Sequence, residues 1–418
     1  MQKLYTFSGV IFMSLVLSGI ISKSTAQSWS IKTSGVTEDL LGVWFVSPMQ
    51  GWAVGEDGVI LVTSDGGDSW TPQVSGVTVN LNDVFFVSPT TGWAVGGSQT
   101  ILHTDNGGST WTVQNSSTSI QVELYSVFFT SPTTGFAAGS NGAPGIIYTT
   151  TNGGATWQVS SAPIEKGIFR IFFTTSNNGW LTGRYGIVYA TTDGGSTWVQ
   201  KLPAGANIMQ HRYGLFMYDN NKGWVCGASL VGVKRTDDGG DTWTNQPVTN
   251  TAGLLDITFT DSLTGWIVGS ATTFGGYPIR YTTDGGATWT LDSSMYLPIS
   301  ALKGVHFLNS TLGWAVGLDG YILRYGVPTS VNGVDAAKDF SIYPNPTTDK
   351  FRITGLDLTS RNTVKVFDVV GRDVLTVQLR SGERDIDVRN FDAGMYFVQV
   401  HTDDANRKPI TRKLTINR

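Results

Sequence analysis

The stretch Gly51-Trp52-Ala53-Val54-Gly55 decides the fold, because variants of it return through most of the chain. The pattern Gly-aromatic-x-x-Gly occurs seven times, with the aromatic residue at positions 52, 93, 136, 180, 224, 266 and 314. Successive copies are therefore 41 to 48 residues apart. A regular spacing of this length indicates a repeat architecture, in which each copy is one supersecondary unit and neighbouring units bury a shared core.

Each repeat contains four short runs of β-forming residues, separated by glycine, proline and other turn formers. In the second repeat we predict strands at 84–87, 93–96, 101–104 and 111–114. Four short strands in a unit of about 40 residues are typical of one blade of a β-propeller. The sequence therefore predicts an all-β fold with a seven-bladed β-propeller over residues 27–326.

The seventh repeat ends at Gly326 without its fourth strand, and a matching segment stands near the front of the chain. Residues 29–36 match residues 70–77 at the Trp, Ser, Gly and Val positions. An incomplete last blade would leave an exposed strand edge. We therefore predict that the N-terminal segment becomes the fourth strand of the last blade and closes the ring.

A second motif precedes the fourth strand of six repeats, and its first copy is TSDGGDSW at residues 63–70. These copies resemble the Asp-box, or bacterial neuraminidase repeat, S/T-x-D-x-G-x-T-W. The short carboxylate or amide can accept backbone N–H groups of the turn, and the glycines can adopt positive φ. We predict a structural role for the six Asp-box residues, which are Asp65, Asn106, Asn152, Asp193, Asp238 and Asp284. Their spacing fits neither an EF-hand nor a catalytic carboxylate pair.

The composition excludes several classes of function. With 28 Lys+Arg, 32 Asp+Glu and a formal net charge of −4, the chain lacks the basic surplus that nucleic-acid binding requires. The single cysteine, Cys226, allows no internal disulfide and no multi-cysteine zinc site. All 14 tryptophans fall at repeat positions, which favours core packing over a sugar-binding platform. We expect no nucleic-acid partner, no metal, no cofactor and no catalytic residues.

Binding is expected at the end of the propeller where the repeats differ from one another. The connections from first to second and from third to fourth strand are uniform, whereas those at the other end of the blades vary. Loops that vary among repeats usually carry specificity.

At that variable end the fourth and fifth repeats carry a predicted basic sector, which consists of Lys166, Arg170, Arg184, His211 and Arg212. The first and second repeats carry a predicted acidic sector, which consists of Glu38, Asp39, Glu56, Asp57 and Asp83. The basic sector is the candidate site for an anionic partner. The alternative is a solvated scatter of ordinary charges.

Residues 1–26 have the pattern of a secretory signal peptide, with Lys3 ahead of an apolar run at 4–21 and small residues at 24–26. A retained membrane anchor is the alternative. No later stretch is apolar enough to cross a bilayer, so we predict no transmembrane segment after signal cleavage. Residues 327–339 are predicted to be a linker.

Residues 340–418 differ from the repeats and show alternating runs at 363–368 and 395–400, which predict a small β-sandwich. The motifs are YPNP at 343–346, VFDVVGR at 366–372, FDAGMY at 391–396 and KLTI at 413–416. This region resembles the type IX secretion system type A C-terminal sorting domain of Bacteroidota. The resemblance implies the type IX secretion machinery as a partner, and a secreted or outer-membrane surface-attached protein of a Gram-negative bacterium.

The repeat region resembles the photosystem II stability and assembly factor family through its Gly-Trp-x-x-Gly and Thr-Thr-Asp-Gly-Gly-x-Thr-Trp motifs. The resemblance implies a seven-bladed propeller. The arginine-rich patch associated with that family is not matched here as a contiguous run.

We expect a secreted or cell-surface module that binds or scaffolds an unknown surface protein or glycan without catalysis. One alternative is a sialidase-like glycoside hydrolase, because Asp-boxes also occur in sialidases. Its site would be drawn from Arg170, Arg184, Arg212, Tyr185, Tyr213 and Glu165, although no spacing enforces that arrangement. The other alternative is an assembly factor for a membrane complex, as the family resemblance implies.

Overall fold

The computed structural model describes residues 27–115, 122–142, 144–203, 210–228, 232–248, 253–271, 276, 278–326, 341–354, 362–368, 373–379, 385–402 and 410–417. The predicted signal peptide and linker lie outside these residues. The pattern of contacts divides the chain into two compact units, Met1–Pro328 and Thr329–Arg418. Each unit is described by itself, and the finer domain boundaries remain predictions.

Within the described part of the first unit, the strands form seven four-stranded antiparallel sheets, which we call sheets 1 to 7. Sheets 1 to 3 consist of β2 (Leu40–Phe45), β3 (Gly51–Gly55), β4 (Ile60–Thr63), β5 (Thr71–Gln73); β6 (Leu81–Phe86), β7 (Gly92–Gly96), β8 (Ile101–Thr104), β9 (Thr112–Asn115); and β10 (Glu123–Phe129), β11 (Gly135–Ser140), β12 (Gly145–Thr150), β13 (Gln158–Val159). Sheets 4 to 6 consist of β14 (Ile168–Phe173), β15 (Gly179–Gly183), β16 (Val188–Thr191), β17 (Val199–Leu202); β18 (Arg212–Met217), β19 (Gly223–Gly227), β20 (Val233–Thr236), β21 (Thr244–Gln246); and β22 (Gly253–Phe259), β23 (Gly265–Ser270), β24 (Ile279–Thr282), β25 (Thr290–Leu291).

Sheet 7 combines the two ends of this unit. It consists of β26 (Leu302–Asn309), β27 (Leu312–Gly317), β28 (Ile322–Gly326) and β1 (Ser28–Lys32). The strand β1 pairs antiparallel with β28, so that Trp29 lies opposite Tyr325 and Ser30 opposite Arg324. The N-terminal strand therefore occupies the outer position that the fourth strand holds in the other sheets.

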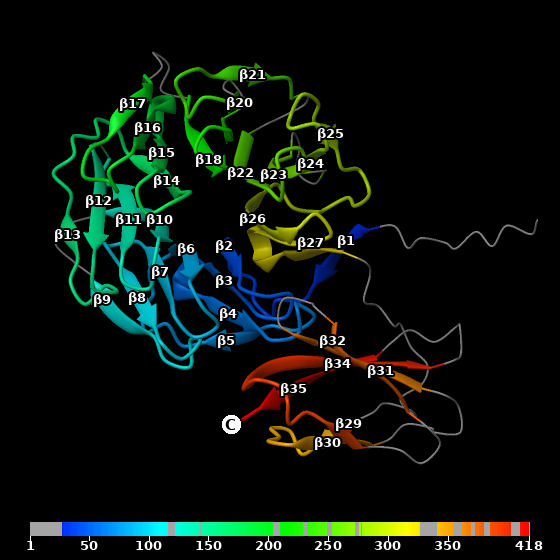
Figure 1. Ribbon diagram of the computed structural model, residues 1–418. Helices are drawn as coiled ribbons and strands as arrows, with labels where there is room; N and C mark the ends of the chain where they lie inside the picture. Colours follow the sequence, from blue (N-terminus) through cyan, green and yellow to red (C-terminus); the bar gives the residue numbers. More distant parts are fainter. Residues whose placement is uncertain are drawn as a thin grey trace, which may run out of the picture. The chain divides into compact units, whose positions relative to one another are not determined.

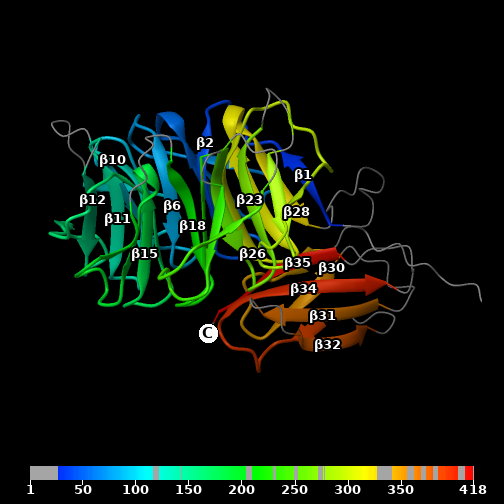
Figure 2. The same cartoon turned by 90° about the horizontal axis from the view of Figure 1, so that it is seen from above.

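The sheets have a propeller-like arrangement around a channel (Figure 1), and Figure 2 shows them standing next to one another. The first strand of each sheet is innermost and contacts the first strand of the next sheet, and β26 contacts β2. We call β2, β6, β10, β14, β18, β22 and β26 the inner strands. The channel is thus bounded by one inner strand from each sheet.

Aromatic stacking joins neighbouring sheets. In five pairs, a phenylalanine near the end of an inner strand stacks on the tryptophan of the preceding sheet's second strand, with ring centroids 3.4 to 3.7 Å apart. The pairs are Phe45–Trp314, Phe86–Trp52, Phe129–Trp93, Phe259–Trp224 and Phe307–Trp266. Parallel stacking of large buried rings contributes both area burial and an aromatic term. The repeated tryptophans are therefore core residues between the sheets.

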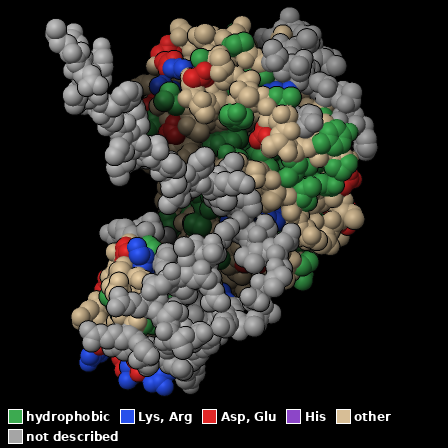
Figure 3. Space-filling view, turned by 90° about the vertical axis from the view of Figure 1, so that its right-hand side faces the viewer, with side chains coloured by type: hydrophobic (Ala, Val, Ile, Leu, Met, Phe, Trp, Pro, Cys, Tyr) green, Lys and Arg blue, Asp and Glu red, His purple; other side chains and the backbone are tan. Residues whose placement is uncertain are grey.

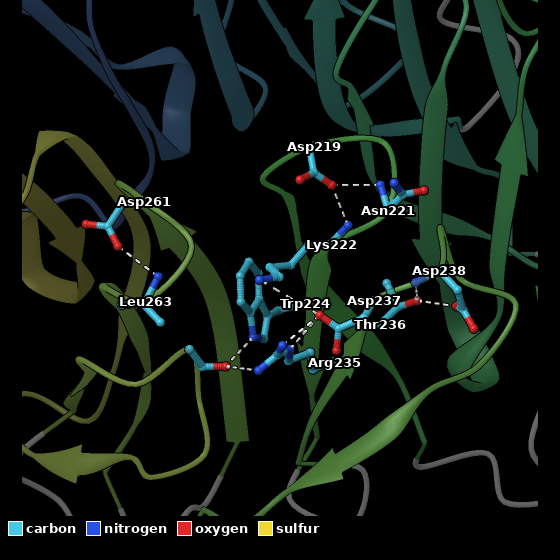
Figure 4. Close-up of polar contacts among 11 residues, drawn as sticks. Asp219, Asn221, Lys222, Trp224, Arg235, Thr236, Asp237, Asp238, Asp261 and Leu263 are labelled. Carbon is cyan, nitrogen blue, oxygen red and sulfur yellow. Dashed lines mark hydrogen bonds and ion pairs between the residues drawn. The ribbon is translucent and has the colours of Figure 1, made fainter.

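Five second-strand tryptophans, four of which belong to the stacked pairs, also hydrogen-bond the Asp-box turn of the following sheet. Each indole N–H donates to a glycine carbonyl at 2.9 to 3.3 Å. The pairs are Trp52–Gly107, Trp93–Gly153, Trp180–Gly239, Trp224–Gly285 and Trp314–Gly66. Figure 4 shows Trp224 in this arrangement, with Arg235 directed at the same glycine oxygen. Each indole thus satisfies its buried N–H while it joins two sheets.

The Asp-box residues hold their own turns. In sheet 5, Thr236 Oγ1 donates to Asp238 Oδ1 at 2.8 Å, and the backbone N–H and hydroxyl of Thr242 donate to the same carboxylate at 2.8 and 2.6 Å. In sheet 2, Asn106 makes the equivalent contacts as an amide and donates from Nδ2 to Thr110. These local hydrogen bonds support the structural role predicted from the motif.

Replacing Asp238 by asparagine is expected to leave the fold intact near neutral pH and to remove one source of acid sensitivity. Hydrogen bonds from the side chain and backbone of Thr242 lower the pKa of Asp238 to about 2, from an ordinary value of 3.8. The ionised form therefore contributes stability above 3.8 that is lost as the pH falls toward about 2. Urea unfolding of both proteins near pH 6 and near pH 2.5 measures this difference. A variant that unfolds at pH 6, or that keeps the full acid loss, would contradict the prediction.

Every inner strand contains a β-bulge near its start, and the sequence did not predict it. In sheet 2 the pairing slips between Leu81 and Asp83, so the strand is β6 (Leu81–Phe86) and our predicted start at 84 is wrong. Equivalent slips occur at the same place in the other six inner strands. A bulge places two consecutive residues opposite one and redirects their side chains. Adjacent pairs such as Asn82 and Asp83 consequently both line the channel.

Cys226 and His306 lie where their repeat positions predict. Cys226 is fully buried in the core of sheets 5 and 6, and burial raises the pKa of its thiol, so it is a core residue. His306 lies opposite Trp314, as Phe85 lies opposite Trp93, and its ring packs on Trp44 at 4.4 Å.

The second unit contains two antiparallel sheets. One consists of β29 (Ser341–Tyr343), β30 (Lys350–Thr354) and β33 (Asp385–Asp387); the other of β32 (Asp373–Leu379), β31 (Asn362–Asp368), β34 (Gly394–Thr402) and β35 (Ile410–Ile416). Buried residues of both sheets, among them Phe351, Ile386, Val364 and Val398, form one apolar cluster. Two sheets around a shared core agree with the predicted small sandwich.

Figure 3 draws one face of the molecule. The view in Figure 3 shows scattered acidic and basic side chains among polar and hydrophobic ones, in keeping with a charged fraction of 14%. Among the described residues, none of the helical segments is long and apolar enough to span a membrane.

Candidate binding site

The inner strands enclose a cavity of about 260 Å³ in the channel. Three successive layers of side chains can be followed along these strands. The mouth layer consists of Leu41, Asn82, Tyr125, Phe169, Tyr213, Leu255 and Lys303, all of which line the cavity. The residues that follow them, which we call the charged layer, are Gly42, Asp83, Ser126, Arg170, Gly214, Asp256 and Gly304.

The charged layer places one guanidinium between two carboxylates. Arg170 Nη1 is 3.6 Å from Asp83 Oδ1, and Arg170 Nη2 is 3.8 Å from Asp256 Oδ1. Burial raises the pKa of both carboxyl groups, and the positive charge of Arg170 opposes that rise. For Arg170 itself burial lowers the pKa, but the two carboxylates outweigh this effect and the pKa is raised. The guanidinium is therefore charged.

Hydrogen-bond donors from neighbouring sheets hold these carboxylates. Asp83 Oδ2 accepts hydrogen bonds from Val127 N at 3.0 Å and from Ser126 Oγ at 3.1 Å, both in sheet 3. Asp256 Oδ2 accepts one from Val305 N in sheet 7 at 3.0 Å. Each carboxylate thus joins its own sheet to the next one.

A layer in which six of seven side chains carry rings, the deep layer, lies two residues further along the inner strands. It consists of Trp44, Phe85, Phe128, Phe172, Phe216, Thr258 and His306. Neighbouring rings in this layer have centroids 4.4 to 5.4 Å apart. These contacts narrow the channel beyond the charged layer and leave the mouth layer as the open side.

The mouth layer is aromatic on the side of sheets 3 to 5. The ring of Phe169 lies 5.2 Å from that of Tyr125 and 4.9 Å from that of Tyr213. Burial raises the pKa of Tyr125, so its hydroxyl is protonated at neutral pH. The result is a continuous aromatic wall on three consecutive sheets.

Basic side chains lie over aromatic rings in and beside this wall. Lys166 Nζ is 5.4 Å from the ring centroid of Tyr185, and the Arg184 guanidinium is 6.0 Å from that of Phe169. Both distances are within the range of cation–π attraction. His211 accepts a hydrogen bond at Nδ1 from the backbone N–H of Tyr185 at 3.2 Å. We call Lys166, Phe169, Arg184, Tyr185 and His211 the rim cluster.

Tyr185 has an unusual backbone conformation. It lies in the short 3-10 turn η2 (Arg184–Gly186) with φ of 58°. The equivalent positions in η1 (Glu56–Gly58) and η3 (Leu318–Gly320) hold Asp57 and Asp319, residues that tolerate this region better. A bulky aromatic residue in a strained turn is a feature that binding sites tend to retain.

The five residues of the predicted basic sector do not form one surface. Lys166, Arg184 and His211 come together in the rim cluster, whereas Arg170 lies in the charged layer beside Asp83, which we had assigned to the acidic sector. Arg212 is only 6% exposed and donates to the Gly186 carbonyl oxygen; burial lowers its pKa to about 10.

The imidazole ring of His211 is uncharged at neutral pH. Burial, followed by the positive charge of Arg184, lowers the pKa of His211 below its ordinary value of 6.5. The neutral ring agrees with the acceptor role of Nδ1. The cationic members of the rim cluster are therefore Lys166 and Arg184.

Several residues of the site escaped the sequence analysis. Asp256, Lys303, Tyr125 and Phe169 were not predicted, and Tyr213 was named only for the sialidase alternative, because the bulge that brings them to the channel leaves no mark on the repeat pattern. An alignment of the repeats with one another could have located the two aspartates, because Asp83 in β6 and Asp256 in β22 occupy the same position of their repeats.

Comparison with known proteins identifies the family. The model described as photosynthesis system II assembly factor YCF48 matches residues 72–147, 149–251 and 244–326, together more than half of the chain. The chain belongs to the YCF48 family. A second model, described as secretion system C-terminal sorting domain, matches residues 341–417. This tail indicates a secreted or cell-surface protein, and the family agrees with the resemblance carried by the repeat motifs.

A curated relative in this family is the photosystem II assembly lipoprotein Ycf48 of Picosynechococcus sp. strain PCC 7002. It is 28% identical over 197 residues, which cover 44% of this chain and 54% of the relative. The chain thus spans about half the length of the curated relative that it matches.

Solved structures show the same fold. A YCF48 structure bound to a D1 peptide has 21% identity and a TM-score of 0.59, covering 71% of this chain and 96% of its own. YCF48 from Cyanidioschyzon merolae has 20% identity and a TM-score of 0.58, with coverages of 71% and 98%. PorZ, a surface component of the type-IX secretion system of Porphyromonas gingivalis, has 15% identity and a TM-score of 0.51, with coverages of 93% and 60%.

Proposed function

We propose that the first unit is a non-catalytic binding module that recognises acidic peptide segments of a surface protein at the rim cluster. The observation that carries the proposal is the placement of Lys166 and Arg184 over aromatic rings at the open side of the channel. Cations held on aromatic faces offer both charge and flat apolar area to an extended peptide. A YCF48 structure bound to a D1 peptide supports a peptide as the class of ligand.

We infer that the seven sheets form one closed seven-bladed ring, with β1 as the closing strand. Two contacts support the inference: the pairing of Trp29 with Tyr325, and the hydrogen bond from Trp314 to the Gly66 carbonyl oxygen at 2.9 Å. A closed ring keeps the rim cluster rigid, because the residues of sheets 4 and 5 cannot move apart.

The glycosidase alternative is weaker. A sialidase-like site needs three arginines directed at one carboxylate, but the candidate guanidiniums have different partners. Arg170 lies between two carboxylates, Arg184 lies on Phe169, and Arg212 donates to a backbone carbonyl. A binding role requires no such convergence.

The sorting tail and the family together suggest the setting for this binding. We propose that the type IX secretion machinery exports the chain through its tail, and that the propeller then acts at the cell surface. Membership of an assembly-factor family favours one specific version, in which the bound segment belongs to a membrane complex during its assembly.

The test is a peptide-binding titration with the purified full chain. A fluorescein-labelled peptide that alternates Glu and Ala is compared with one in which Gln replaces Glu. We expect the acidic peptide to bind at least about tenfold more tightly at low salt, and to weaken as salt screens the charges.

Two double variants locate the site. Lys166→Ala with Arg184→Ala is expected to weaken the acidic peptide by about tenfold or more. Lys32→Ala with Arg235→Ala removes the same charge elsewhere, from partly exposed pairs with Asp68 and Asp237, and should leave binding unchanged. Equal binding of both peptides, or equal effects of both double variants, would overturn the proposal.

A further inference from the structure

The charged layer is a second feature of the channel, separate from the rim cluster. Its three ionic side chains line the cavity together with the mouth layer. Phe169 lines this cavity and also belongs to the rim cluster, but the ionic side chains of the two differ, so a ligand can occupy the cavity whether or not acidic peptides bind at the rim.

The Arg170 guanidinium is left with open donors. Its nearest contacts to Asp83 and Asp256, at 3.6 and 3.8 Å, are too long for hydrogen bonds. Among the described residues, no hydrogen-bond acceptor is assigned to Arg170. A guanidinium has five N–H donors, and here it lines a cavity with room beside it.

The two carboxylates also keep acceptor capacity. Asp256 accepts one backbone hydrogen bond at each oxygen, from Ile257 N and Val305 N, both at 3.0 Å. An ionised carboxylate offers about four acceptor positions, so about two are left on Asp256. Asp83 accepts from Val84 N at Oδ1 and has further capacity there.

Stability alone does not account for this layer. Buried charges are compensated only where the geometry is good and hydrogen bonds satisfy the groups. Asp83 and Asp256 are 8% and 5% exposed, yet their cationic partner bonds to neither. A layer of apolar residues would fill the channel at lower cost in desolvation. Hydrogen-bond acceptors and donors that lie side by side in a cavity with unused capacity are typical of a ligand-binding site.

We propose that this cavity binds a free α-amino acid as its zwitterion. The ligand carboxylate would accept hydrogen bonds from Arg170, and the ligand ammonium would donate to the carboxylates of Asp83 and Asp256. Both charges of a zwitterion have a group of opposite charge at one level of the channel. A simple anion would be repelled by the two carboxylates, and a simple cation would be repelled by the guanidinium.

The rest of the cavity suits an apolar side chain. Tyr125, Phe169 and Tyr213 form the aromatic wall, and Leu41 and Leu255 line the cavity as well. A cavity of about 260 Å³ matches a single amino acid rather than a longer peptide. The ring contacts of the deep layer narrow the far side, so we place the entry at the mouth layer.

The experiment is isothermal titration of the purified full chain with L-leucine and L-phenylalanine. The matched ligands are N-acetyl-L-leucine, which lacks the ammonium, and L-leucinamide, which lacks the carboxylate. We expect at least one of the two free amino acids to bind with a Kd below about 1 mM. If leucine binds, each of its two derivatives should bind at least about tenfold more weakly than leucine. If phenylalanine alone binds, its N-acetyl and amide derivatives replace those of leucine.

Protein variants provide the second line of evidence. Arg170→Met should abolish amino-acid binding, whereas Lys166→Ala with Arg184→Ala should retain it, which separates this proposal from the proposed function. Because Arg170→Met leaves two carboxylates without their cation, the ligand derivatives serve as the decisive test if that variant fails to fold. The proposal would be overturned if neither amino acid bound at concentrations up to about 10 mM, or if an acetylated derivative bound as tightly as its parent amino acid.

Discussion

Replacing Trp29 by alanine is expected to lower the free energy of unfolding by about 3–5 kcal/mol. The indole is 4% exposed and belongs to the short strand β1, far in sequence from the strand it joins. Its ring contacts Phe307 edge-on at 5.7 Å and Tyr325 at 5.2 Å. Removal of the indole leaves a cavity in sheet 7 and weakens the attachment of β1. Urea denaturation followed by circular dichroism measures the change.

Ile31→Ala is the matched control for this prediction. Ile31 lies in the same strand but is 50% exposed, so its truncation should cost less than about 1 kcal/mol. If the two substitutions had the same small effect, β1 would not be an integral strand of sheet 7. The inference of a closed ring would then fail.

Replacing Asp256 by alanine is expected to cost about 2–4 kcal/mol. The carboxylate accepts hydrogen bonds from the backbone N–H groups of Ile257 and Val305, and its loss leaves both donors without a protein acceptor. Since Val305 belongs to sheet 7, the substitution also removes a bond between two sheets. The unfolding midpoint in urea reports the change.

Asp256→Asn separates the hydrogen bonds from the charge. The amide oxygen can still accept, so we expect a loss smaller than that of the alanine variant by more than about 1 kcal/mol. Burial raises the pKa of Asp256 in the folded protein above its unfolded value of 3.8. Protonation of the folded protein therefore adds stability at pH values below 3.8, and this stability is lost as the pH rises through the raised pKa. The asparagine variant should lack this dependence. Equal losses for the two variants would contradict the account of the charged layer.

The repeat pattern predicted much of the fold from the sequence. The spacing of the Gly-aromatic-x-x-Gly copies located the second strands, and 101–104 coincides with β8. Packing explains this success, because a second-strand tryptophan such as Trp52 both stacks on a phenylalanine of the next sheet and donates a hydrogen bond to its Asp-box turn. The residue type and the spacing are therefore both constrained by contacts that recur in each repeat.

The channel could not be predicted in the same way. Alternation assigns every second residue of a strand to one face, but the bulge between Ile168 and Arg170 breaks that rule. As a result, Phe169 and Arg170 both line the cavity. The bulge depends on the backbone pairing of β14 with β15 in one sheet and not on a residue type, so no sequence motif indicates it.

Charge assignments from sequence were also incomplete. Arg212 and Arg184 come from neighbouring repeats and had been grouped as one basic surface, but Arg212 is buried against the Gly186 carbonyl. Whether a basic residue faces a partner or a backbone oxygen depends on the turn beside it. The strained η2 turn at Tyr185 is such a feature, and it can be located only in three dimensions.

Hydrogen–deuterium exchange of the full chain, with and without the alternating Glu-Ala peptide, tests the central claim that the rim cluster is the binding site. The account predicts slower exchange at residues 166–170, 184–187 and 210–213 when the peptide is bound, because backbone groups there become less accessible. Protection confined to the Asp-box turns, such as residues 65–70, or no protection at a saturating peptide concentration, would contradict it.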